Sequence, residues 1–168
     1  MNTGKNRKLH AIVSPQEIRS LRFAIVVSRF NISVTAKLLE GAEECLLHHG
    51  LTKKNYRIFY CPGSFELPQV ANVLAAQKEW QAIICLGAVI RGETPHFEYV
   101  AAETARGVME TSLRWSKPVV FGVLTTNTEK QALDRAGGKE GHKGWDAALT
   151  AIEMTSVFRS VQGTSKTR

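Results

Sequence analysis

The stretch AIICLGAVIRGETPHFEYV, residues 82–100, carries the clearest structural signal in the chain. Its first five residues form a continuous apolar run, typical of a strand buried on both faces, and Gly87 interrupts that run. Gly92 and Pro95 then predict a loop, and an amphipathic pattern that begins near His96 predicts a helix. Ligands of parallel α/β sheets bind outside the carboxyl ends of the strands, so we expect the chemistry of this protein in that loop.

Three more strand signals extend the same alternation of strands and helices. Asn31 or Ser33 can cap the helix after the first strand, and Pro68 suits the first turn of the next helix. Thr128 and Gln131 have the spacing of a capping box. The expected strands span 23–27, 56–60, 82–86 and 118–124, and helical patterns cover 34–46, 67–78, 96–115, 128–136 and 145–152.

Four strands that alternate with helices predict a parallel sheet with right-handed crossovers, and therefore a three-layer α/β/α sandwich of the flavodoxin-like kind. A chain of 168 residues suits one such domain. We expect a basic N-terminal arm at 1–22, the domain at 23–158 and a basic C-terminal tail at 159–168. The narrow sheet has two open edges. The extended segment at 10–13 either pairs with an edge of a neighbouring copy, or packs on its own domain or on nothing.

The formal net charge of +7 is concentrated at the two ends of the chain. The first 22 residues carry five basic side chains and one acidic, residues 159–168 carry three basic side chains, and the residues between them are neutral. Single-strand nucleic-acid binding needs a basic groove with interleaved aromatic residues, which this distribution does not predict. No apolar run approaches the length that spans a membrane. The sequence therefore favours neither a nucleic acid nor a membrane as a partner.

The cysteines and most histidines predict no metal site. Cys45, Cys61 and Cys85 lie in or beside apolar segments and lack metal-binding spacing. Their odd number does not suggest a disulfide framework, so we expect reduced thiols in a cytoplasmic protein. The adjacent His48 and His49 have no carboxylate or cysteine at ligand spacing.

The loops after the first two expected strands lie on the same rim as the loop after the third. Phe30 and Phe65 are large apolar residues in these loops, where they can stack on a planar heterocycle or cap the core beneath them. Glu66 can interact with a helix dipole or accept hydrogen bonds from sugar hydroxyls. His96 is the only histidine on this rim, and histidine suits proton transfer near neutral pH.

The rim also carries groups that suit a phosphate. Thr94 and the backbone amides near Gly92 and Glu93 precede a helix, which is the arrangement that binds phosphate without cofactors. Arg135 and Lys143 flank a glycine-rich loop and can supply charge-assisted hydrogen bonds to a phosphate monoester. Both are equally typical of solvated surface charges.

Five segments, in this order, resemble the lumazine synthase family over about residues 23–158. They are RFN at 29–31, PGSFELP at 62–68, LGAVIRGETPHF at 86–97, FGVLT at 121–125 and QALDRAGGKEGHKG at 131–144. The resemblance implies a transferase that condenses 5-amino-6-(D-ribitylamino)uracil with 3,4-dihydroxy-2-butanone 4-phosphate. The products would be 6,7-dimethyl-8-ribityllumazine, phosphate and water, in the penultimate step of riboflavin biosynthesis.

The resemblance also implies site residues, no cofactor, and a homo-oligomer in which Phe121 and Arg135 reach the site from an adjacent subunit. The assembly would be a pentamer or an icosahedral shell of pentamers, with riboflavin synthase as a candidate partner. His96 would transfer protons, and the butanone phosphate would contact Glu93, Thr94, Arg135 and Lys143. The ribitylaminouracil would contact Phe30, Asn31, Ser64, Phe65, Glu66, Ala88, Val89, Ile90 and Phe121.

The chain departs from the family pattern at Pro95, directly before the histidine, and at His142, where GNKG is usual. Three rival interpretations stand beside the family reading. One is a flavodoxin-like or lumazine-synthase-like module that only holds a flavin or a lumazine. The second is a Schiff-base enzyme with Lys143 as nucleophile. The third is a structural shell, which is compatible with catalysis.

Overall fold

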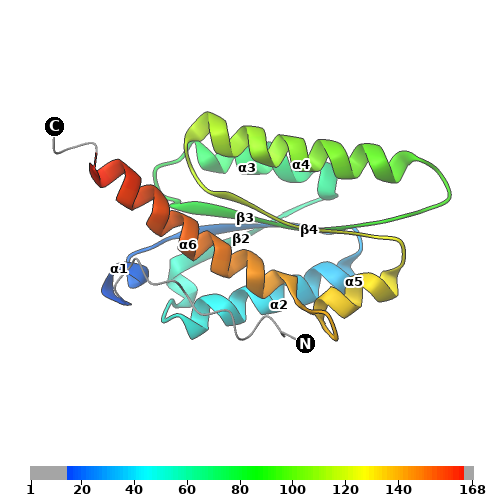
Figure 1. Ribbon diagram of the computed structural model, residues 1–168, viewed down its shortest axis with the longest axis horizontal. Helices are drawn as coiled ribbons and strands as arrows, with labels where there is room; N and C mark the ends of the chain where they lie inside the picture. Colours follow the sequence, from blue (N-terminus) through cyan, green and yellow to red (C-terminus); the bar gives the residue numbers. More distant parts are fainter. Residues whose placement is uncertain (1–14, 165–168) are drawn as a thin grey trace.

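A four-stranded parallel sheet in the order β2-β1-β3-β4 forms the centre of the molecule (Figure 1). The computed structural model describes residues 15–164, so the expected extended segment at 10–13 lies outside the described residues. The central strands β1 and β3 pair with each other, β2 adds to the free side of β1, and β4 adds to the free side of β3. The strands are β1 (Phe23–Ser28), β2 (Tyr56–Cys61), β3 (Ala82–Ile90) and β4 (Val119–Thr126).

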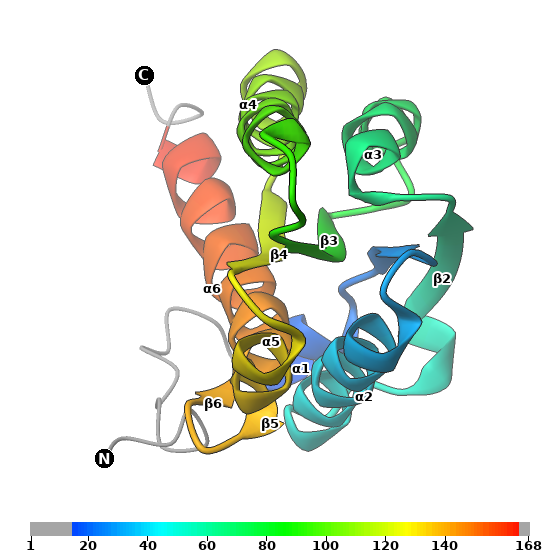
Figure 2. The same ribbon diagram turned by 90° about the vertical axis from the view of Figure 1, so that its right-hand side faces the viewer.

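Helices cover both faces of this sheet, so the predicted three-layer α/β/α sandwich is confirmed (Figures 1 and 2). One face carries α3 (Leu67–Ala75) and α4 (His96–Trp115), and the other carries α2 (Ile32–His48), α5 (Glu129–Arg135) and α6 (Lys143–Thr164). Shorter elements connect them: α1 (Pro15–Arg19), the 3-10 turns η2 (Lys53–Asn55) and η3 (Ser64–Glu66), and a hairpin of β5 (Ala136–Gly138) and β6 (Gly141–His142).

The two layers of helices create two apolar cores, and β1 contributes to both. All six residues of β1 are buried. Phe23, Ile25 and Val27 pack in the core beneath α2 and α6, whereas Ala24 and Val26 pack in the core beneath α3 and α4. Successive side chains of a strand point to opposite faces, so a continuous apolar run is what a strand covered on both faces requires.

Strand β3 is longer than predicted, because Gly87 does not end it. The strand continues to Ile90, and residues 88–90 pair in register with residues 124–126 of β4. A Cβ at Gly87 would lie 2.6 Å from Ser64 Oγ and 2.9 Å from Leu67 Cδ1. The glycine therefore allows η3 and α3 to approach the sheet closely and is not a strand terminator.

The packed region also extends beyond the predicted domain boundaries at both ends. Helix α1 precedes the sheet, and Ile18 and Leu21 are buried in the core although they belong to the expected basic arm. Asn55 Nδ2 holds this segment by donating hydrogen bonds to Arg19 O (2.9 Å) and Leu21 O (3.0 Å). At the other end α6 continues past residue 158 to Thr164.

The predicted helix ends differ in detail from the observed ones. Asn31 is the N-cap residue of α2 in a left-handed conformation (φ 57°), but its side chain does not cap the helix. Thr128 Oγ1 accepts from Gln131 N (3.2 Å) as a capping box requires. The return bond goes from Asn127 N, not Thr128 N, to Gln131 Oε1 (2.9 Å). Pro68 lies in the first turn of α3 as predicted, although that helix ends at Ala75 instead of residue 78.

The glycine-rich loop after α5 is a small antiparallel hairpin that the sequence did not predict. Gly137 and Gly141 have positive φ angles of 108° and 88°. The His142 ring occupies the space beside Gly41 of α2, where any Cβ would collide with it. This contact places the hairpin against α2 and accommodates the residue that departs from the family pattern.

Helices α2 and α6 cross so closely that only glycine fits at residue 144. A Cβ there would lie 2.6 Å from Leu38 C and 2.8 Å from Leu38 Cα. We predict that Gly144→Ala lowers the free energy of unfolding by about 3 kcal/mol, because helix backbones cannot separate without loosening the core. Urea unfolding at fixed protein concentration measures this. In Gly163→Ala, on the same helix with open space around the glycine, stability should stay equal or rise by up to about 1 kcal/mol. Equal losses in both variants would contradict the close crossing.

Candidate active site

The loops after β1, β2 and β3 meet at the carboxyl edge of the sheet and enclose a cavity of about 400 Å³. Figure 2 looks toward the end of the molecule from which these loops project. Nine of the predicted site residues line the cavity: Phe30, Ser64, Phe65, Glu66, Ala88, Val89, Ile90, Thr94 and His96.

Two aromatic side chains form an exposed apolar part of this cavity. Phe30 is 69% exposed and Phe65 is 49% exposed, so neither ring is used to cap the core. Backbone hydrogen bonds fix the turn that carries Phe30, because Arg29 N donates to Cys61 O (2.9 Å) and Phe30 N donates to Pro62 O (3.0 Å). A rigid loop with a free ring face suits stacking on a planar heterocycle.

Asn31 connects the first loop to the end of β3. Its Nδ2 donates a hydrogen bond of 2.9 Å to Ala88 O, and its left-handed backbone directs the side chain there. The residue was predicted as a substrate contact, but it does not line the cavity. Its amide instead fixes the loop that carries Phe30 relative to the strand end.

Ser64 contributes a buried hydroxyl to the cavity wall. Its Oγ has no hydrogen-bond partner among residues 15–164, and its backbone carbonyl accepts from Thr104 Oγ1 (3.2 Å). Buried polar atoms usually have a partner, so an unpaired hydroxyl beside a cavity indicates a ligand that can supply one. Glu66, at the end of the same turn, is half-buried.

Helix α4 begins at His96, as predicted, and no side chain caps it. Its N-cap residue is Pro95, which makes no side-chain hydrogen bond. Among residues 15–164 the side chains of Glu93, Thr94 and His96 are exposed and form no hydrogen bond or ion pair. An uncapped helix start next to a cavity offers free backbone donors and a positive dipole end to an anion.

Three residues that were not predicted from the sequence also line the cavity, namely Gly63, Phe97 and Val100, together with Gly92, near which phosphate-binding amides were predicted. Val100 follows His96 by one helical turn on the same face of α4, so the helical spacing would have indicated it. Phe97 is adjacent to His96 and half-buried, and it packs on the core beneath α3 and α4. No periodic pattern in the sequence identifies Phe97 as a residue of the cavity.

Besides Asn31, four predicted site residues do not line this cavity within one chain: Glu93, Phe121, Arg135 and Lys143. Phe121 and Lys143 line a separate groove of about 660 Å³ between α4 and α6 over β4. Lys143 Nζ forms an ion pair with Asp146 Oδ2 (2.8 Å), and Arg135 Nη1 donates to Gln131 O (3.1 Å).

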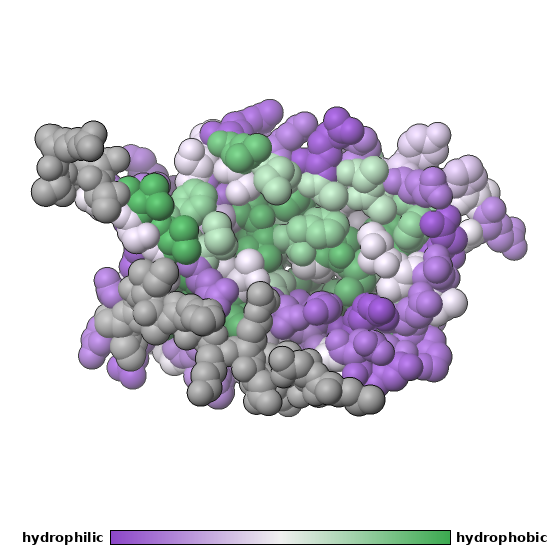
Figure 3. All heavy atoms as spheres, viewed as in Figure 1, coloured by the Kyte–Doolittle hydropathy of each residue, from purple (hydrophilic) through white to green (hydrophobic). Residues whose placement is uncertain are grey.

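The groove over β4 is strongly apolar. Figure 3, in the view of Figure 1, shows hydrophobic residues gathered between α4 and α6. Met109, Leu113 and Phe121 are exposed there, by 60%, 71% and 40%. A contiguous exposed apolar area of this kind marks an interaction surface.

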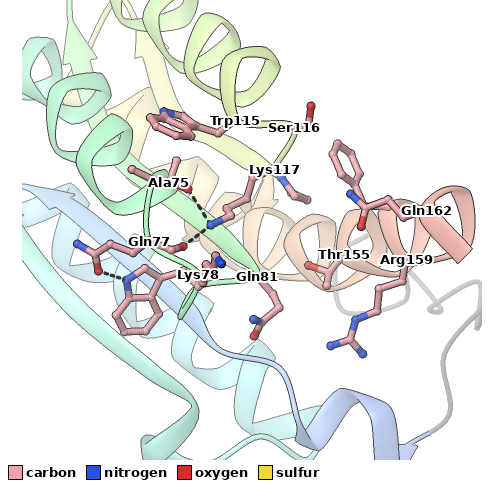
Figure 4. A pocket seen from close by; sticks show the side chains of 14 residues that line it. Ala75, Gln77, Lys78, Gln81, Trp115, Ser116, Lys117, Thr155, Arg159 and Gln162 are labelled. Atoms are coloured by element: carbon pink, nitrogen blue, oxygen red, sulfur yellow. Dashed lines mark hydrogen bonds between the residues drawn. The ribbon is translucent and has the colours of Figure 1, made fainter.

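A third cavity, of about 500 Å³, lies at the amino ends of β3 and β4, away from the loops just described (Figure 4). Lys117 points into it, but its Nζ donates to Ala75 O (2.8 Å) and Gln77 O (2.5 Å) at the end of α3. Partial burial lowers the pKa of Lys117. The ammonium thus completes the end of α3, which is a structural use of the charge.

Thiol and metal chemistry have little support in the described part of the chain. Cys45, Cys61 and Cys85 are free and buried, and burial raises the pKa of Cys45 to about 12 and that of Cys61 to about 11. These groups are thiols near neutral pH and therefore weak nucleophiles. Residues 15–164 contain no cluster of three metal-ligating side chains. None of their helices is long and apolar enough to cross a bilayer.

Comparison with known proteins supports the family resemblance. A family model described as 6,7-dimethyl-8-ribityllumazine synthase matches residues 20–159. Two relatives with that name, from Syntrophus aciditrophicus and Chlorobium luteolum, are each 51% identical to the chain over 143 residues. The matched region covers 85% of this chain, and 93% and 92% of the two relatives.

The matched region includes all three loops around the cavity, the sheet and both layers of helices. The resemblance predicted from five sequence segments is confirmed. The chain therefore belongs to the 6,7-dimethyl-8-ribityllumazine synthase family and is a transferase of riboflavin biosynthesis.

Proposed function

We propose that the cavity at the carboxyl edge of the sheet holds both substrates of the condensation. The enzyme joins 5-amino-6-(D-ribitylamino)uracil to 3,4-dihydroxy-2-butanone 4-phosphate and forms 6,7-dimethyl-8-ribityllumazine. The observation that carries this placement is the composition of one cavity. It combines two exposed aromatic rings, an unpaired buried hydroxyl, and an uncapped helix start that carries a histidine.

In this proposal Phe30 stacks on the pyrimidine, and residues 88–90 contact its polar edge. The ribityl chain extends along Ser64, Phe65 and Glu66. Ser64 Oγ would gain its missing partner from a ribityl hydroxyl, and the Glu66 carboxylate would accept from others. Support comes from the lining of this cavity, which combines an exposed aromatic ring with hydroxyl and carboxylate side chains.

The phosphate of the second substrate would bind at the start of α4. Glu93 and Thr94 would contribute backbone amides, and Thr94 its hydroxyl. Arg135 and Lys143 would add positive charge from a neighbouring subunit. Support comes from the position of the uncapped helix start in the cavity wall, beside His96.

We further infer a homo-oligomer whose active sites lie between subunits. Within one chain Phe121 lies in the apolar groove over β4, and β4 is an edge strand among the described residues. A neighbouring subunit could cover this groove and receive Phe121 and Arg135 in its own site. A pentamer or an icosahedral shell of pentamers fits this reading, and the short hairpin between Arg135 and Lys143 resembles shell-forming members.

Two further parts of the proposal concern the surroundings of the enzyme. Riboflavin synthase is a candidate partner, because it consumes the product of this reaction. A cytoplasmic location is supported by three free cysteines that are all buried.

The mechanism needs proton transfers and no covalent enzyme intermediate. The 5-amino group attacks the ketone, and loss of water gives an imine. A proton then leaves the adjacent carbon as the C–O bond to phosphate breaks, and the ribitylamino nitrogen closes the ring with loss of a second water. His96 is the group in the cavity suited to carry these protons.

Lys143 is a poor candidate for a Schiff-base nucleophile. Its Nζ forms an ion pair with Asp146, and the residue does not line the cavity of its own chain. The substrate's own amine therefore suffices as nucleophile. Borohydride added during turnover should leave Lys143 unmodified, whereas a reduced adduct on Lys143 would restore the Schiff-base reading.

Replacing His96 tests the proton-transfer role. We predict that His96→Ala lowers kcat by roughly ten- to a hundredfold, because proximity of a reactive amine and ketone supplies the rest of the acceleration. Pyrimidine affinity and assembly should stay nearly unchanged, and His48→Ala at the far end of α2 is the matched control. Wild-type turnover across neutral pH would mean that bound water or the substrate phosphate carries the protons.

Replacing Arg135 tests phosphate recognition. Arg135→Ala should weaken butanone-phosphate binding by about 2 to 3 kcal/mol, with a much smaller effect on pyrimidine binding. Lys130→Ala on the same helix is the control, because the Lys130 side chain is 77% exposed and does not line the cavity. If both substrates lose affinity equally, Arg135 maintains the interface and does not bind the phosphate.

Mixed oligomers test whether sites are shared. When His96→Ala and Arg135→Ala subunits are co-expressed with different tags, some sites combine an intact His96 with an intact Arg135 from the neighbour. Random assembly predicts recovery of about a quarter of wild-type activity in purified mixed particles. Activity no higher than the mean of the two variants would show that each site lies within one chain.

A further inference from the structure

Arg91 does not line the cavity, yet it contacts the end of β4, the loop after β4 and the first turn of α4. It is the first residue after β3, and its backbone N donates to Thr126 O at the end of β4 (2.9 Å). Its Nε donates to Asn127 Oδ1 (3.0 Å), and its Nη1 donates to Glu98 Oε1 (3.2 Å). The guanidinium carbon lies 4.5 Å from the centre of the Phe97 ring. We call Arg91, Phe97, Glu98 and Asn127 the Arg91 clamp.

The loop after Arg91 has little other support. A Cβ at Gly92 would meet no atom within 4 Å. The side chains of Glu93 and Thr94 make no hydrogen bond within residues 15–164, and the N-cap residue Pro95 gives α4 no side-chain hydrogen bond. Contacts from the two ends of the loop must therefore fix its position, and Arg91 makes contacts at both.

We infer that Arg91 is a positioning residue for butanone-phosphate binding. One planar guanidinium joins the end of β3, the first turn of α4 and the loop that leads into α5. Phe97 and Glu98 directly follow His96, so the same contacts fix the histidine and the free amides at the helix start. Preorganised donors bind an anion better than donors that must first be ordered.

The clamp acts through geometry more than through stability or charge. The Arg91 and Glu98 side chains are 43% and 64% exposed, and exposed ion pairs contribute little to stability. Glu98 also neutralises the guanidinium locally, which weakens any direct attraction of Arg91 for phosphate. Lysine cannot reproduce the clamp, because an ammonium lacks the planar fork that reaches two acceptors and stacks on a ring.

Steady-state kinetics with each substrate varied in turn tests this inference, which rests on the proposed phosphate site. In Arg91→Met we expect the KM for butanone phosphate to rise about tenfold, with the pyrimidine KM changed less than about twofold. The thermal unfolding midpoint should stay within about 2 °C of the wild type. Arg106→Met is the matched control, because Arg106 forms an exposed ion pair with Glu103 on the same helix and should leave both KM values unchanged.

Companion variants distinguish positioning by the clamp from a pure charge effect and from a general structural role. Glu98→Ala and Asn127→Ala each remove one acceptor of the guanidinium. Both should raise the butanone-phosphate KM, and their effects should largely disappear in the Arg91→Met background. Arg91→Lys should recover only part of the loss. Full recovery in Arg91→Lys would show that charge alone matters, and equal changes in both KM values would show a general structural role; either result overturns the inference.

A separate arm tests the phosphate site itself. Arg135→Ala and Thr94→Val are measured in the same assay as the clamp variants. If neither changes the butanone-phosphate KM, the proposed phosphate site is wrong, whatever Arg91 does. If both raise it while Arg91→Met does not, the site stands and the positioning role of Arg91 is rejected.

Discussion

The parallel pairing of β3 with β4 beyond Gly87 is the constraint on which the rest of the site depends. Three further residue pairs carry both strands to the edge of the sheet, and Arg91 N adds one more hydrogen bond to Thr126 O. This extension brings the backbone of residues 88–90 to the cavity and determines where α4 begins. The close approach of η3 to this strand, with Ser64 beside it, is possible only because residue 87 lacks a Cβ.

The other groups around the end of β3 are held by their backbone or by neighbouring residues. The side-chain atoms that face a substrate in our proposal therefore stay free to bind it. Asn31 is held by Ala88 O, Ser64 is held through its carbonyl by Thr104, and the start of α4 is held by Arg91. The Phe30 ring, the Ser64 hydroxyl and the His96 imidazole have no hydrogen-bonding or stacking partner among residues 15–164. Such preorganisation suits a reaction between two reactive substrates, in which correct placement supplies much of the acceleration.

The sequence predicted the sheet, its helices and most of the cavity, because local signals determine them. Apolar runs and one run rich in β-forming residues identified four strands, and motif order identified the family. Local signals failed at positions whose structure depends on contacts with residues that are distant in the sequence. Gly87 resembled a terminator because its neighbour Ser64 is remote in sequence, and Ile18 and Leu21 were hidden in a basic segment. The sequence could not show where the Asn31 side chain lies, because its hydrogen-bond partner, Ala88 O, belongs to a distant part of the chain.

The central claim is that the carboxyl-edge cavity holds the pyrimidine beside the start of α4. A crystal structure of the protein with 5-amino-6-(D-ribitylamino)uracil and inorganic phosphate tests it most directly. We expect the ring against Phe30 and residues 88–90, with the phosphate at the first turn of α4 next to His96. A ring bound in the groove between α4 and α6, or in the cavity beside Lys117, would contradict this placement.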